Sequence, residues 1–191
     1  KESLIRSRDF CKSLKETLQN KKEDVLNKGT WEVLFTDLAK NYKIHEIVGL
    51  NFLSTSKEFA VNPYGDFGLS YWSEIRPKTM RDKAYLVLKK LKNPLHFEDL
   101  TKSINSVGFD KKTAHAPTVH NELIRDSRFV LVGRGMYALR EHGFVPGTAR
   151  ETIMRLLDDK GPLDKKEIMA LVLKERFLKE NTVFLNLQNR K

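Results

Sequence analysis

Apolar side chains recur at helical spacing in the middle of the chain. The residues that share one face of this predicted helix are Ala84, Tyr85, Leu88 and Leu91. Pro94 ends the helix, because proline disfavours helical geometry at the residue before it. A short second helix is predicted to begin near His96, followed by acidic residues that suit the positive end of a helix dipole.

A third helix is predicted to begin at Pro117-Thr118. Proline suits the first turn of a helix, and a threonine hydroxyl can cap it. Val119 and Leu123 recur four residues apart, so we expect both to face the core. The residues predicted to point outward from this helix are Thr118, Asn121, Glu122 and Arg125.

Two short strands are predicted after the third helix. Residues 128–132 are rich in β-branched and aromatic side chains, which favour a strand. Gly133-Arg134-Gly135 supplies a turn, and residues 136–139 return as the partner strand. Three helices followed by a hairpin make a winged helix. The aromatic residues predicted to lie in cores near such strands are Phe67, Tyr71, Trp72, Phe129 and Tyr137.

The same order of segments recurs along the chain. Pro94-Leu95 falls on Pro162-Leu163 at a shift of 68 positions, and residues 117–123 match residues 181–187 at a shift of 64. In a fainter copy, Phe35 and the five residues after it resemble the segment that begins at Phe97. Self-similarity at a fixed spacing indicates one small structural unit used several times.

The predicted fold class is therefore mainly α with small β-wings (α+β), arranged as tandem winged-helix repeats. The predicted units are residues 1–73, residues 74–146 and residues 147–191, the last of which ends before its wing. In the first unit, an opening helix runs through residues 1–30, and residues 62–66 form the turn of a longer wing. In the last unit, Asp164 stands near the start of the second helix.

Charge is distributed unevenly along the chain. The formal net charge is +10, and residues 74–146 carry 14 Lys and Arg against 8 Asp and Glu. Residues 1–73 are nearly balanced, with 11 against 10. A basic surface attracts polyanions through long-range attraction and counterion release. Many soluble proteins are this basic without a nucleic-acid partner, so charge alone leaves that question open.

The sequence offers little for catalysis, and we expect neither a cofactor nor a metal. Cys11 is the single cysteine, which excludes an intramolecular disulfide and a four-thiolate zinc site. His115 and His120 are five residues apart, which does not align two ligands on one helical face. We find no Ser-His-Asp or Cys-His arrangement, and no stretch approaches the roughly 20 apolar residues of a membrane span. A reducing cytoplasm is the expected location.

The middle unit resembles the HARE-type helix-turn-helix domain. The likeness is carried by the turn at residues 94–97, the helix start at Thr118-Val119 and the segment Gly-Arg-Gly-Met-Tyr-Ala-Leu at residues 133–139. That family occurs in the delta subunit of bacterial RNA polymerase, in chromatin-associated proteins and in some restriction enzymes. Residues 62–65 and 118–123 also resemble segments of bacterial sigma-factor-like proteins that carry this domain. No sigma region-4 motif is present, so promoter reading cannot be assigned to this segment.

The resemblance implies a non-catalytic transcription accessory protein that binds duplex DNA, RNA polymerase core, or both. In winged helices the third helix can enter the major groove. The residues expected to contact DNA are Lys111, Lys112, Thr118, Asn121, Arg125 and Arg134 in the middle unit, and Thr182, Asn186, Asn189 and Arg190 in the last. Each of these exposed polar residues can equally be a solvated surface residue.

Two alternatives remain open at this point. The chain can be a protein-interaction module that docks on RNA polymerase without touching DNA. It can also be a specificity segment of a DNA-modifying enzyme, which a nuclease or methylase motif elsewhere in the gene would indicate.

Overall fold

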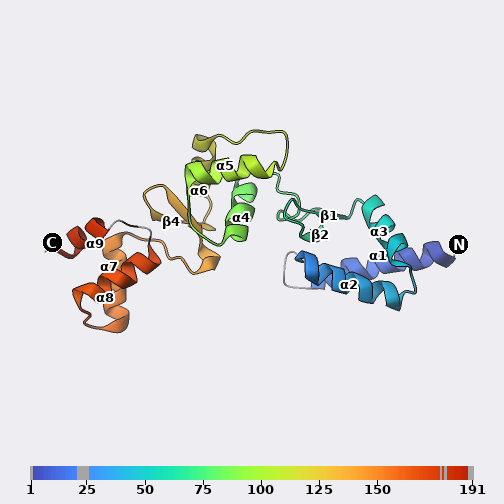
Figure 1. Ribbon diagram of the computed structural model, residues 1–191, viewed down its shortest axis with the longest axis horizontal. Coiled ribbons are helices and arrows are strands. Elements are labelled where there is room, and N and C mark those ends of the chain that lie inside the picture. The colour runs from blue at the N-terminus through green and yellow to red at the C-terminus, as the bar shows by residue number, and fades with distance from the viewer. Residues whose placement is uncertain (1, 21–25, 177, 179, 189–191) are drawn as a thin grey trace. The chain divides into compact units, whose positions relative to one another are not determined.

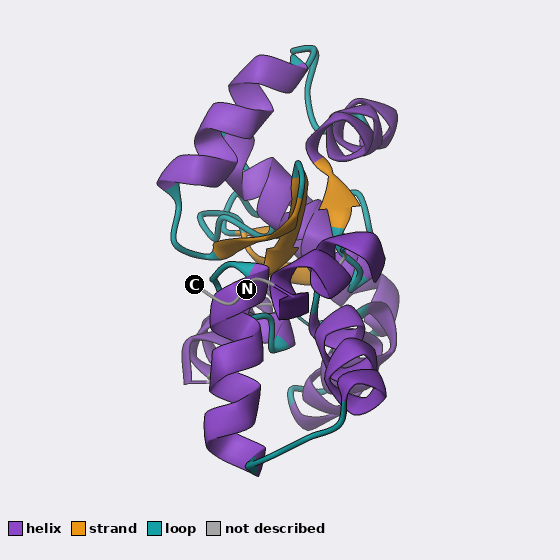
Figure 2. Cartoon of the chain, turned by 90° about the vertical axis from the view of Figure 1, so that its left-hand side faces the viewer, coloured by secondary structure: helices purple, strands orange, loops and turns teal. Residues whose placement is uncertain are grey.

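The structure is a computed structural model that describes residues 2–20, 26–176, 178 and 180–188 (Figure 1). The chain divides into two compact units, Lys1–Asp82 and Lys83–Lys191. Helices make up most of the described chain, and the strands are few and short (Figure 2). The predicted class, mainly α with small β elements, is confirmed. The finer division into three tandem winged helices stays a prediction.

The first unit contains three helices followed by a hairpin. Its elements are α1 (Glu2–Asn20), α2 (Lys28–Asn41), α3 (Glu46–Thr55), β1 (Phe59–Val61) and β2 (Phe67–Leu69). β1 and β2 pair antiparallel, with Phe59 opposite Leu69. Leu26, between α1 and α2, bridges to Phe67 on the other edge of β2.

Apolar side chains from all three helices and the hairpin form the core of this unit. Leu14 and Leu18 of α1 are each 1% exposed, as the spacing of the opening helix predicts. Phe67 stacks on Trp31 of α2 with ring centroids 5.1 Å apart, and on Phe59 at 5.7 Å. The aromatic rings therefore join α2 to the hairpin.

Asn62 forms the turn that the sequence predicts at residues 62–66. Its Oδ1 accepts hydrogen bonds from the backbone amides of Tyr64 and Asp66, at 2.9 and 3.0 Å. Its Nδ2 donates to Asp66 Oδ2 and to the backbone oxygen of Glu74. Because every polar atom of this buried amide has a partner, the turn is strongly specified.

Tyr71 corrects one expectation, since its side chain is 64% exposed. It lies just after β2, where the chain turns, and its ring makes an edge contact with Trp72. Phe67, Phe129 and Tyr137 are buried as predicted. An aromatic residue after a strand can face either way, and the sequence pattern alone does not determine the side.

The second unit contains a winged helix and a set of three helices. The elements of the winged helix are α4 (Met80–Leu91), β3 (Leu95–His96), α5 (Phe97–Val107), α6 (Ala116–Arg125), β4 (Phe129–Gly133) and β5 (Met136–Leu139), followed by the short helix η1 (Arg140–His142). The strand order is β3-β5-β4. The two-residue strand β3, which the sequence analysis missed, pairs with β5 through Leu95 opposite Tyr137.

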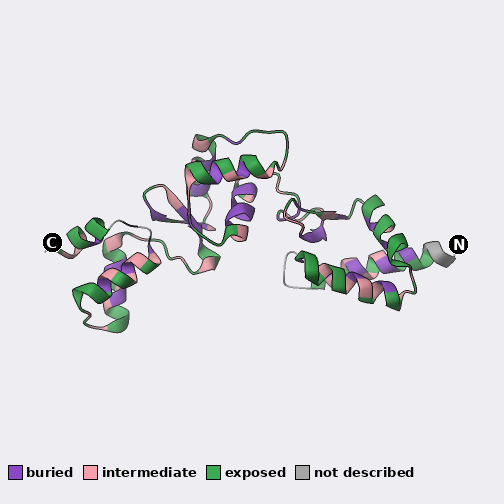
Figure 3. Ribbon diagram, in the orientation of Figure 1, coloured by how far each residue is buried: buried purple, intermediate pink, exposed green. Residues whose placement is uncertain are grey.

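The first helix of this domain is buried more completely than its spacing indicates. All six residues from Lys83 to Leu88 are buried, whereas Leu91 is 45% exposed. Much of α4 is accordingly coloured as buried in Figure 3. Leu91 is more exposed than the other three residues of the predicted face because α4 ends there. A helix buried on nearly every side is the central element on which the domain packs.

The remaining helices are α7 (Ala149–Lys160), α8 (Lys165–Glu175) and α9 (Glu180–Gln188). Thr148 caps α7 and Asp164 caps α8, each in a capping box with the glutamate three residues later. Asp164 therefore stands at the helix start that the sequence predicts. The core of this set comprises Ile153, Leu156, Ile168, Val172 and Val183.

Arg176, directly after α8, connects this helical set to the winged helix. Its side chain is 6% exposed, and Nη2 donates to the backbone oxygen of Leu131 in β4 at 3.0 Å. Nη1 lies 3.4 Å from Thr152 Oγ1, whereas Nε is buried and has no acceptor among the described residues. Burial lowers the pKa of Arg176, and the carboxylates of Glu151 and Glu175 oppose that shift.

Candidate nucleic-acid interface

Helix α6 presents one apolar and one polar face. Val119 and Leu123 are 0% and 1% exposed, so they anchor the helix in the core as predicted. Thr118, Asn121 and Arg125 are exposed, also as predicted. Polar side chains on a helix held firmly from behind can meet base edges in a major groove.

A row of stacked rings holds α6 against its neighbours. Phe97, the first residue of α5, stacks on His120 of α6 with ring centroids 4.6 Å apart. His120 also contacts the ring of Tyr137 in β5 edge-on at 5.7 Å, and His96 lies 4.5 Å from Phe97 on the other side. The row therefore connects α5, α6 and the wing. No sequence signal pointed to it, because the four residues come from four elements, β3, α5, α6 and β5.

The loop before α6 is anchored at both ends. The Lys83 ammonium, 3% exposed, lies 2.7 Å from Asp110 Oδ2, and Asp110 Oδ1 accepts from the backbone amide of Lys112 at 3.0 Å. The hydrogen bond from Lys83 is the main cause that lowers the pKa of Asp110, and the Lys112 amide adds to it. Farther along, Asn105 donates to the backbone oxygen of Ala114 and accepts from its amide.

The anchored loop presents two lysines beside α6. Lys111 and Lys112 are exposed, and within the residues that the structure describes neither side chain has an ion-pair partner. Lysines at fixed positions next to a helix N-terminus can contact phosphates of a duplex. The sequence analysis predicted that these two lysines contact DNA, but it did not predict the contacts that fix their loop.

The wing ends in a two-residue turn, Arg134-Gly135, between β4 and β5. Gly135 has a φ of 69°, a left-handed conformation that favours glycine. The backbone amide of Phe97 donates to the Gly135 oxygen at 2.9 Å, which fixes the turn to the start of α5. Arg134 is exposed at the tip, where the sequence placed it.

The residues predicted in the last unit are placed less favourably. Thr182 is exposed on α9, but Asn186 is half-buried and its Nδ2 donates to the Thr182 backbone oxygen at 2.7 Å. Asn189 and Arg190 lie outside the described residues. Between Glu180 and Gln188 the helix carries no lysine or arginine. The middle unit therefore holds the basic part of the candidate interface within the described chain.

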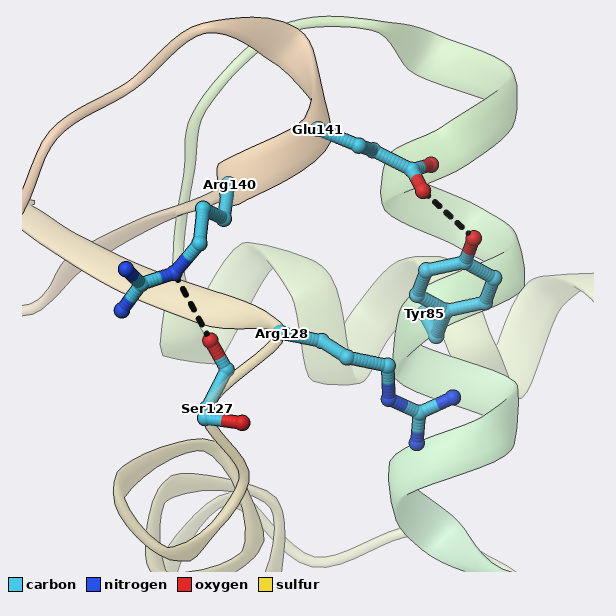
Figure 4. Close-up of a pocket in the computed structure, with 5 residues that line it drawn as sticks. All are labelled: Tyr85, Ser127, Arg128, Arg140 and Glu141. Carbon is cyan, nitrogen blue, oxygen red and sulfur yellow. Dashed lines mark hydrogen bonds between the residues drawn. The ribbon is translucent and has the colours of Figure 1, made fainter.

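A cavity of about 610 Å³ lies between α4 and the ends of the wing strands (Figure 4). Arg128 is held by Asp126, at 2.6 Å from Nη2, and its guanidinium lies 4.7 Å from the centre of the Tyr85 ring. The Tyr85 hydroxyl donates to Glu141 Oε2 at 2.8 Å, and Arg140 Nε donates to the Ser127 backbone oxygen.

The charged groups of this cavity do not converge on a common point. The guanidinium groups of Arg128 and Arg140 point in different directions (Figure 4). Each arginine is already held by a neighbouring carboxylate or carbonyl oxygen. The contacts join the two ends of the domain, and we assign them a structural role.

Neither metal ligation nor membrane insertion is indicated by the part of the chain that the structure describes. No group of three or more His, Cys, Asp or Glu side chains gathers there to hold a metal ion. None of its helices has the length and apolar character required to cross a bilayer.

Comparison with known proteins identifies one domain. Residues 78–142 match the HARE-HTH family, the helix-turn-helix domain described from ASXL proteins and restriction endonucleases. The matched range begins just before α4 and ends with η1, so it covers the complete winged helix. Neither a curated protein nor a solved structure matches the chain. The family match points to DNA binding by a helix-turn-helix.

Proposed function

From the HARE-type winged helix that this chain contains at residues 78–142, we propose that the protein is a non-catalytic transcription accessory factor that binds duplex DNA. The observation that carries the proposal is the geometry around α6. Its exposed polar face follows an anchored loop that carries Lys111 and Lys112, and Arg134 stands at the tip of a wing that is anchored to the start of α5. All of these cations lie within the one domain that matches a family.

Each residue has a distinct proposed role. Asn121 and Arg125 contact base edges in the major groove, where amide and guanidinium groups can form paired hydrogen bonds. Lys111 and Lys112 contact phosphates, and Arg134 contacts a phosphate or the adjacent minor groove. Glu122, half-buried on the same helix, limits how closely that part of α6 approaches the duplex. Thr182 and Asn186 are secondary contacts at most.

RNA polymerase core is the second proposed partner, and a bacterial cytoplasmic, nucleoid-associated setting follows from either proposal. One observation favours a protein partner: α3 of the first unit exposes apolar side chains, with Ile47 62% and Leu50 44% exposed. This helix contains no lysine or arginine. A surface of that kind suits contact with a protein rather than with a phosphate backbone.

The test is a titration of the full chain with random-sequence duplex DNA across a salt series. We expect a dissociation constant of about 10⁻⁴–10⁻⁶ M near physiological salt, with affinity falling steeply as salt rises. The variant Arg125→Glu/Arg134→Glu should lose at least about tenfold in affinity for DNA. A tenfold loss corresponds to about 1.4 kcal/mol of binding free energy. The matched control, Lys160→Glu/Lys174→Glu, changes the net charge equally at exposed positions on α7 and α8.

Two outcomes separate the proposals. Equal losses in both double variants would show that net charge, rather than α6 and the wing, determines binding. If the folded chain does not bind DNA at low salt but is retained on polymerase core after nuclease treatment, polymerase docking is supported instead.

A further inference from the structure

A groove runs along the inner side of α3 in the first unit. Its volume is about 430 Å³, and residues from α2, α3 and the hairpin line it. Trp31 and Phe59 both stack on Phe67, and these rings form an aromatic wall. Leu50 and Val61, 44% and 53% exposed, line the groove from the helix and the edge of β1. Together these side chains make a concave apolar surface.

The surroundings of the groove do not suit nucleic acid. Glu46 is the only charged residue of α3, and residues 1–73 carry almost no net charge. Ile47, 62% exposed, extends the apolar surface along the helix beyond the groove. An exposed apolar patch next to a concave site is typical of protein–protein contact.

One charged side chain of the lining lacks an ion-pair partner within the described chain. Arg76 is the one charged residue of the lining, and its exposed side chain forms no ion pair among the described residues.

We propose that this groove binds a short segment of a partner protein in which apolar residues stand next to an aspartate or glutamate. The apolar side chains contact Leu50, Val61 and the aromatic wall. The side-chain carboxylate of the segment pairs with Arg76. Hydrophobic anchors with a few placed polar contacts are the common way in which such grooves combine affinity with specificity.

The experiment selects a phage-displayed library of random twelve-residue peptides on the full chain. We expect the enriched peptides to share an apolar cluster beside an acidic residue. Synthetic peptides of those sequences, with amidated C-termini, are then titrated while tryptophan emission is recorded. The chain contains two tryptophans, so a Trp72→Phe background leaves Trp31 as the reporter, and its emission should shift on binding.

Matched variants locate the site. Leu50→Gln/Val61→Gln and Arg76→Gln should each weaken peptide binding by about tenfold or more, equivalent to 1.4 kcal/mol. The control Ile5→Gln/Val33→Gln replaces two exposed apolar residues of the same unit outside the groove, and it should bind as the wild type does. Circular dichroism confirms that each variant is folded.

Three results would overturn the proposal. They are the absence of enriched peptides, enrichment of peptides without an acidic residue, and equal binding to the groove variant and the wild type. Because none of these readouts uses DNA, failure here leaves the DNA-binding proposal untouched, and loss of DNA binding leaves this one untouched.

Discussion

The Lys83 ammonium lies 2.7 Å from the Asp110 carboxylate, and this ion pair joins a buried helix to an exposed loop. Lys83 is 3% exposed, whereas Asp110 is 40% exposed. A lysine is almost never fully buried without a partner. The pair therefore fixes the loop that carries Lys111 and Lys112, and several consequences can be measured.

Removing the acidic partner should destabilise the domain more than removing the lysine. Asp110→Ala leaves a buried ammonium without its carboxylate, whereas Lys83→Met leaves a carboxylate that water can reach. In urea denaturation we expect the unfolding midpoint to fall further for Asp110→Ala than for Lys83→Met. Asp99→Ala, which removes an exposed ion pair with Lys102, is the control and should change the midpoint least. A larger fall in the midpoint for Lys83→Met than for Asp110→Ala would show that the burial of Lys83 does not depend on Asp110.

The same ion pair should appear in the pH dependence of stability. The pKa of Asp110 in the folded protein is lowered, so the pair stabilises above the ordinary carboxyl pKa of about 4, and that stability is lost as the pH falls through the lower folded value. The difference in unfolding free energy between the wild type and Lys83→Met should therefore be constant from neutral pH to about pH 5 and change below about pH 4. A difference that stays constant down to pH 2 would contradict the ion pair.

Lys111 and Lys112 should contribute to the salt dependence of DNA binding. Each is proposed to contact a phosphate, and each phosphate contact adds about 1 to the slope of log affinity against log salt. Lys111→Gln and Lys112→Gln should each reduce the slope by about 1, and the double variant by about 2. Lys160→Gln, on the exposed end of α7, should leave the slope unchanged. Equal effects at all three positions would exclude a specific contact by the loop.

Gly135 at the wing should tolerate alanine less well than Gly108. Both have a positive φ, 69° and 66°, so alanine costs about 1–2 kcal/mol at either. At Gly135 the added methyl group would also meet the side chain of His96, whereas the space around Gly108 is open. We expect Gly135→Ala to lower the unfolding free energy further, as measured by denaturation. The additional loss at Gly135 relative to Gly108 should become smaller in a His96→Ala background. If it does not change, the contact between the added methyl group and His96 is excluded.

Local chemistry was enough to predict the helix starts and the wing turn. Pro117 stands in the first turn of α6, and Arg134-Gly135 forms the turn of the wing, because both depend on residues adjacent in sequence. The predicted cap at Thr118 is wrong, because His115 is the N-cap residue and Thr118 lies inside the helix. The spacing of Val119 and Leu123 likewise predicted which side of α6 is buried. The assignment of DNA contacts to the other side remains a prediction.

The contacts that hold the site together could not be predicted in this way. Lys83 and Asp110 are 27 residues apart, and the stack of Phe97 on His120 joins two different helices. Such pairs depend on how elements pack, which periodicity does not encode. β3 was missed because two residues are too few to show the alternation of a strand.

Arg176 has a consequence for how the protein behaves at high concentration. β4 is an outer strand of its sheet, and outer strands offer free backbone groups on which other chains can assemble. By binding the Leu131 carbonyl, Arg176 occupies one of those groups and lays the end of α8 beside the strand. The helices after the winged helix thus cover part of an open strand edge. A chain that ends between residues 142 and 149 is expected to self-associate at protein concentrations at which the longer chain does not.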